Sequence, residues 1–70
     1  MSTPAVYEIR FLGHLPSQWS AWFEGLEIAN HPDGEATLSG PFRDQAELYG
    51  VLDKLRDLNL PLIYVKRRDD

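Results

Sequence analysis

Residues 26–40, LEIANHPDGEATLSG, carry the strongest local signal in this chain. Pro32 presets the backbone angle of a turn, and Gly34 accepts the positive φ that closes it. On both sides of the turn, apolar residues alternate with polar ones, as they do in strands with one buried face. The stretch therefore predicts a hairpin of two strands, residues 26–30 and 35–40, in which Pro41 ends the second strand.

The flanking segments predict two further strands. In residues 6–12, Tyr7, Ile9 and Phe11 share one face, while Glu8 and Arg10 alternate onto the other. Residues 62–66 are apolar on both faces, and we expect Ile63 and Val65 to point inward with Leu62 and Tyr64 outward. The chain thus supplies four strands.

Two helices are predicted between the strands. The longer covers residues 45–58, because Asp44 and Glu47 resemble a capping box and the following leucines and valine recur at helical spacing. The shorter covers residues 18–24, begins after Ser17 as N-cap and ends at Gly25. Its aromatic stripe is typical of core packing rather than of a stacking platform for bases, and it contains Trp19, Trp22 and Phe23.

This order predicts an α+β fold, a ferredoxin-like two-layer sandwich with the order β-α-β-β-α-β. Its sheet would have four antiparallel strands in the order 4-1-3-2, with both helices on one face. Residues 1–70 would form a single domain with flexible ends at 1–5 and 67–70. The competing interpretation is an irregular α+β meander.

Composition excludes several classes of function. The net charge of −4 disfavours binding to nucleic acid and to anionic membranes. The chain contains no cysteine, and its two histidines are too few for a transition-metal cage, so we expect no metal and no cofactor. No segment has the length of a membrane span or the pattern of a signal peptide, which favours a cytoplasmic protein.

One face of the predicted sheet has no helix to cover it. On that face Val6, Leu12, Leu62 and Tyr64 would form an apolar patch beside a polar half. A small monomer rarely leaves such a patch exposed, so we expect a homodimer through the open sheet face or the edge of strand 62–66. A different protein partner is the alternative.

No catalytic motif is present, and we expect no catalytic residue. The candidates for ligand or partner binding are Arg10 and Tyr64 on the open face, and His14 beside the start of the first helix. His31 is interpreted as a surface residue. A weak polar or divalent-ion site near Asp33, Glu35 and Asp57 has no specific spacing to support it.

Several motifs resemble a group of small uncharacterised prokaryotic proteins of about 70 residues. The matching pieces span nearly the whole chain: residues 7–10 (YEIR), 13–15 (GHL), Trp19 with 22–26 (WFEGL), 38–41 (LSGP), and 44–46 (DQA) running on to 56–58 (RDL). That group has no known activity, so the resemblance implies a similar chain length and sequence pattern but no functional residues.

The strand and helix order is more loosely similar to ACT-type regulatory domains. This resemblance implies side-by-side pairing and a small-ligand site near the first strand-helix loop, here residues 13–17 with Arg10. Three functions follow, in order of preference: a non-enzymatic homodimerising interaction module, an amino-acid-sensing domain of the ACT kind, and a small dimeric enzyme using His14 or His31.

Overall fold

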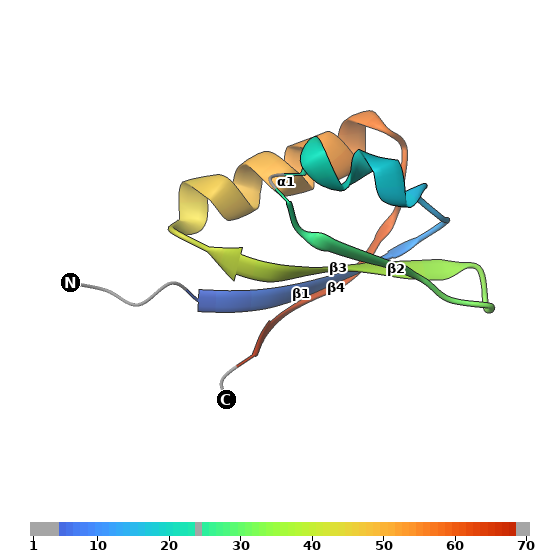
Figure 1. Ribbon diagram of the computed structural model, residues 1–70, viewed down its shortest axis with the longest axis horizontal. Helices are drawn as coiled ribbons and strands as arrows, with labels where there is room; N and C mark the ends of the chain where they lie inside the picture. Colours follow the sequence, from blue (N-terminus) through green and yellow to red (C-terminus); the bar gives the residue numbers. More distant parts are fainter. Residues whose placement is uncertain (1–4, 24, 69–70) are drawn as a thin grey trace.

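The computed structural model describes residues 5–23 and 25–68. Its sheet contains β1 (Ala5–Leu12), β2 (Glu27–Asn30), β3 (Glu35–Phe42) and β4 (Leu62–Arg68) in the order β2-β3-β1-β4, with every pair antiparallel. This is the strand order that the sequence predicted. The single α-helix of the described residues, α1 (Gln45–Asp57), and the short 3-10 helix η1 (Ser17–Ala21) lie on the same side of the sheet (Figure 1).

The prediction of two helices in a ferredoxin-like β-α-β-β-α-β fold is wrong. A helix was expected over residues 18–24; the described part of this stretch, residues 18–23, contains only residues of the five-residue η1 and the turn after it, and residue 24 lies outside the described residues. The prediction of Ser17 as N-cap is wrong, because Ser17 is the first residue of η1. The N-cap position is occupied by Pro16, and no side-chain capping hydrogen bond forms there. So short a segment cannot offset the cost of nucleating an α-helix. A 3-10 helix is the form that short pieces adopt, because each of its hydrogen bonds spans three residues instead of four.

The core lies between the sheet and α1. Its fully buried side chains include Ile9 and Phe11 from β1, Leu38 from β3, and Val51 and Leu55 from α1. Asp44 caps α1, since its Oδ1 accepts the backbone N–H of Glu47 at 2.9 Å, as the sequence predicted. Asn59 ends the helical region with a φ of 58°.

The aromatic stripe of η1 divides between core and surface. Phe23 is fully buried and Trp19 packs against the core, as expected, but Trp22 is 45% exposed. The prediction that all three pack in the core is therefore wrong for Trp22.

Two strands extend beyond their predicted ends. β3 continues to Phe42 through Pro41, because β2 begins at Glu27 opposite Ser39, so that at Pro41 β3 has β1 alone as a neighbour. Ala5, Arg67 and Arg68 were expected in flexible ends and instead belong to β1 and β4, while residues 1–4 and 69–70 lie outside the described residues.

A bulge changes the orientation of β4. The register between β1 and β4 shifts between Arg10 and Phe11, so that Arg10 faces Tyr64 whereas Phe11 faces Leu62, with Ile63 as the extra residue. Leu62 therefore shares the helix-side face with Phe11, and the apolar patch predicted for the open face does not form. Val65 faces Ile9 and therefore has the predicted inward direction, whereas Ile63 is the bulge residue; they are 37% and 45% exposed, respectively.

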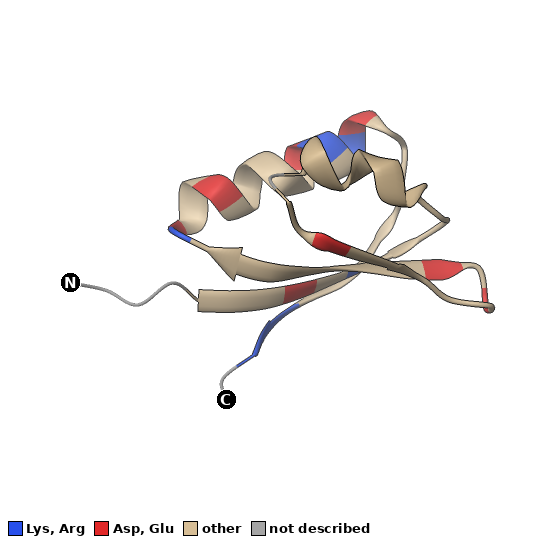
Figure 2. Cartoon of the chain, viewed as in Figure 1, with Lys and Arg blue, Asp and Glu red and all other residues tan. Residues whose placement is uncertain are grey.

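No helix in residues 5–23 and 25–68 is long and apolar enough to span a membrane. Basic residues gather on the second half of β4, whereas acidic residues are spread over the hairpin, β1 and α1 (Figure 2).

Candidate functional site

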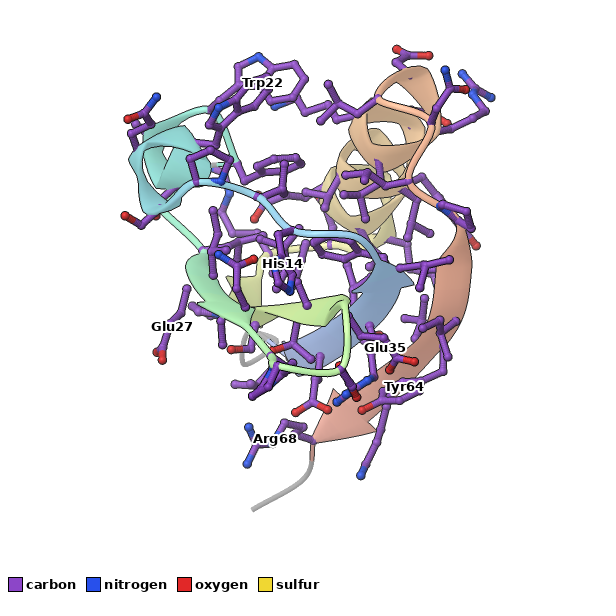
Figure 3. All side chains as sticks on the ribbon, turned by 90° about the vertical axis from the view of Figure 1, so that its right-hand side faces the viewer. His14, Trp22, Glu27, Glu35, Tyr64 and Arg68 are labelled. Carbon is purple, nitrogen blue, oxygen red and sulfur yellow. The ribbon has the colours of Figure 1, made fainter. Side chains whose placement is uncertain are left out.

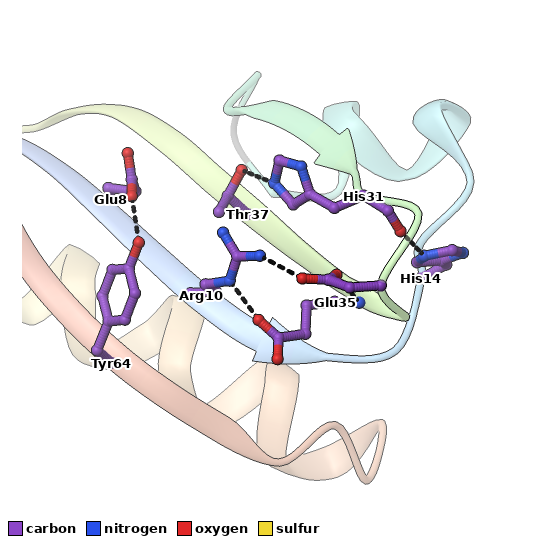
Figure 4. Close-up of polar contacts among 8 residues, drawn as sticks. Glu8, Arg10, His14, His31, Glu35, Thr37 and Tyr64 are labelled. Carbon is purple, nitrogen blue, oxygen red and sulfur yellow. Dashed lines mark hydrogen bonds and ion pairs between the residues drawn. The ribbon is translucent and has the colours of Figure 1, made fainter.

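A row of polar side chains crosses the open face of the sheet, with Arg10 at its centre (Figure 4). Arg10 Nη2 donates to Asp33 Oδ2 at 3.0 Å, and its Nε donates to Glu35. The hairpin turn positions both carboxylates, since Asp33 Oδ1 also accepts the backbone N–H of Glu35 at 2.9 Å. The hydrogen bond to Glu35 raises the pKa of Arg10, and that of Asp33 is lowered mainly by its bond to the Glu35 backbone.

Tyr64 continues this row on β4. Its hydroxyl donates to Glu8 Oε2 at 2.5 Å, and Arg68 Nη1 lies 3.6 Å from Glu8 Oε1. The bond from Tyr64 is the main reason why the pKa of Glu8 is lowered, and the same bond raises the pKa of the Tyr64 phenol. A phenol with a raised pKa and a carboxylate with a lowered one are poor proton donors and acceptors near neutral pH. Both shifts move these groups away from the neutral range in which a general acid or base works best.

We expect Tyr64→Phe to raise the pKa of the Glu8 carboxyl. Because that pKa lies below its ordinary value in the folded protein, the Tyr64 bond stabilises the fold above the unfolded-state pKa. This contribution is lost as the pH falls through the folded-state value. A carbon-detected NMR titration of the wild type and Tyr64→Phe measures the shift, and Glu27 on β2 is the control carboxyl. Equal Glu8 pKa values in the two proteins would contradict the assignment.

His14 lies apart from Arg10 and Tyr64. Its Nε2 donates to the backbone carbonyl of His31 at 2.7 Å, which ties the loop after β1 to the hairpin. His31 Nε2 lies 3.3 Å from Thr37 Oγ1. The structure thus brings two of the three predicted binding residues together, and the binding role of all three stays a prediction. No group of three His, Asp or Glu residues within the described chain is arranged to hold a metal ion.

The free edge of β4 is the second candidate surface. β4 lies at the end of the sheet, pairs with β1 alone, and contains no buried residue. Leu62, Ile63 and Val65 are 51%, 45% and 37% exposed. Beside them, an open groove of about 390 Å³ separates the C-terminal half of α1 from the start of β4, with an apolar lining that includes Leu52, Leu55, Leu60, Pro61 and Leu62.

Sequence reasoning named this edge as a candidate interface but missed the groove. The run of four residues from Leu62 to Val65 has no period of two, so its pattern does not reveal which side chains point inward. In the structure, the bulge opposite Arg10 determines these directions. It turns Leu62 from the open face toward the helix side, where Leu62 lines the groove.

A family model described as a domain of unknown function (DUF8691) matches residues 6–66, in agreement with the resemblance to small uncharacterised proteins. The matches include no ACT-type or ferredoxin-like family. No curated protein and no solved structure matches the chain.

Proposed function

The chain belongs to the DUF8691 family, domains of unknown function, and we propose that it is a non-enzymatic interaction module that forms a symmetric homodimer through the free edge of β4. One observation carries the proposal: the seven residues of β4, of which four are hydrophobic, have a neighbouring strand on one side only. An unpaired strand edge offers a row of backbone donors and acceptors to a second strand.

The shape of β4 suits a second copy of itself. Two identical strands related by a twofold axis pair in antiparallel fashion, which continues the antiparallel order of this sheet. In a pair centred on Val65, Tyr64 of one copy faces Lys66 of the second, and Leu62 faces Arg68 of the second. This register keeps the basic triplets Lys66–Arg68 apart and sets each beside the apolar half of the other strand.

The apolar surface near the edge favours the same partner. Edge strands of monomers are commonly protected by charged residues, and here Lys66–Arg68 protect only the second half of β4. The first half remains exposed beside the apolar groove. A domain of 70 residues buries a small core, and added apolar burial between copies would raise its stability.

We expect the wild type at about 100 µM, far above the Kd of a stable dimer, to sediment as a dimer, twice the chain mass of 8.0 kDa. Val65→Lys should sediment as a monomer, because the twofold axis would set two like charges directly opposite each other. Val65→Glu should do the same. An equimolar mixture of the two variants should recover the dimer, since opposite charges then face each other across the axis.

Ala29→Lys is the matched control, since it adds the same charge to β2, the opposite edge strand. We expect it to remain dimeric. A monomeric wild type at this concentration would contradict the homodimer. A dimer that persists in Val65→Lys would place the interface on another surface.

A further inference from the structure

A second groove lies in the helix layer. It has a volume of about 520 Å³ and is lined by Gln18, Trp19, Trp22 and Leu58, at the junction of η1 with the C-terminal end of α1. Figure 3 places Trp22 on the far side of the molecule from Glu35 and Tyr64 of the open sheet face. The groove is therefore distinct from the row of polar residues around Arg10.

The indole of Trp22 is held in place although it is 45% exposed. Its ring lies edge-to-face against Trp19 at 5.2 Å and against Phe23 at 5.0 Å between centroids. Lys54 Nζ donates to the Trp22 carbonyl at 2.7 Å and lies 5.1 Å from the ring centroid. An exposed aromatic side chain that is already ordered loses little entropy on binding, which is the property of an interface anchor.

The chemistry of the lining restricts the ligand. Tryptophan side chains donate hydrogen bonds and accept none, and Lys54 also donates only. Three backbone carbonyls among the described residues of this region already have partners: those of Trp19 and Ser20 accept backbone N–H groups, and that of Trp22 accepts Lys54. Gln18 alone among the lining side chains contains an acceptor. The groove therefore suits a ligand that offers acceptors and flat apolar surface but few donors.

We propose that this groove binds a proline-rich segment in the polyproline II conformation. Proline has no backbone N–H, while its carbonyls project outward as acceptors and its ring packs flat against an indole. The conformation exists before binding, so that a shallow groove with limited contact area can still select it. Bases and sugars carry several donors, for which the lining side chains offer a single acceptor, on Gln18.

The test uses the only two tryptophans of the chain, both of which line the groove. Titration with decaproline, which has no aromatic residue, should shift the tryptophan emission to shorter wavelength and saturate. The flexible decapeptide (Gly-Ser)₅ should produce no shift. With fluorescein-labelled decaproline, Trp22→Ala should weaken binding by about tenfold or more, the usual effect of removing an aromatic anchor.

Leu58→Ser provides a second lining variant, and circular dichroism verifies that both variants are folded. Val65→Lys should bind decaproline like the wild type, which separates this proposal from the homodimer. Three outcomes would overturn it: no saturable shift with decaproline, equal affinity for (Gly-Ser)₅, or undiminished binding by folded Trp22→Ala and Leu58→Ser. Quenching by a dT10 oligonucleotide without any response to decaproline would instead identify a base-stacking site.

Discussion

Phe23→Ala is expected to lower the free energy of unfolding by about 3–5 kcal/mol, the cost of emptying a fully buried phenylalanine site. A domain of this length has a total stability of about 4–10 kcal/mol, so the variant loses a large share of it. Phe23 is the second residue after η1, and it packs in the cluster formed by β1, β3 and α1. Urea unfolding followed by far-ultraviolet circular dichroism measures the effect.

Trp22→Ala is the matched control for Phe23→Ala, because it removes the neighbouring aromatic ring from a partly exposed position. It should cost about 1–2 kcal/mol, the value of its edge-to-face contacts with Trp19 and Phe23. Equal losses for the two variants would show that η1 is not attached to the core through Phe23.

Gly40→Ala is expected to destabilise the fold by about 2 kcal/mol or more, from backbone strain and overpacking together. Gly40 has a φ of 153°, and a Cβ added to it would lie 2.7 Å from Cδ2 of Leu26. Leu26 directly precedes β2 and is buried, so its side chain has little room to move. Thermal and urea unfolding should both show the loss.

Gly34→Ala separates the two causes. Gly34 also has a positive φ, 88°, but no atom lies within 4 Å of the Cβ that alanine would add. This variant should lose only the cost of the left-handed conformation, about 1–2 kcal/mol. If Gly34→Ala is as damaging as Gly40→Ala, then contact with Leu26 does not explain the requirement for glycine at position 40.

The elements that the sequence predicted correctly have local causes. α1 begins where Asp44 caps the N–H of Glu47 and ends near Asn59, the αL residue. The hairpin turns at residues 32–34, where Gly34 adopts a positive φ. Capping and turn formation depend on a few neighbouring residues, which is why the residue types alone identify them.

The candidate site was predicted in part for a similar reason. Arg10 and Tyr64 were expected on the open face, and the structure pairs them across β1 and β4. That Arg10 would already be bonded to Asp33 and Glu35 depends on the hairpin folding toward β1, a contact between residues more than twenty positions apart. His14 bonds to the His31 carbonyl for the same reason, and no local signal reveals that bond.

The aromatic stripe illustrates the limit of periodicity. Trp22 and Phe23 both belong to an apolar run, yet one ring is buried and the other lies at the surface. A five-residue 3-10 helix takes its orientation from the surface on which it packs. Here the phenyl ring of Phe23 is buried in the core with side chains of the sheet and α1. The spacing i, i+3, i+4 places side chains on one face of an α-helix only. Because this segment does not form an α-helix, the spacing does not predict which of its rings is buried.

Residue types were enough to predict the four strands, the hairpin turn and the cap of α1, because turns, caps and alternation act over a few residues. The strand order was expected from the ferredoxin-like arrangement, and it depends on pairing between distant strands. The loss of the first α-helix, the bulge in β4 and the exposure of Leu62, Ile63 and Val65 arose from packing between distant segments. A continuous apolar run fits either face of a sheet with similar energy. Its orientation is therefore set by neighbouring strands and by where α1 lies.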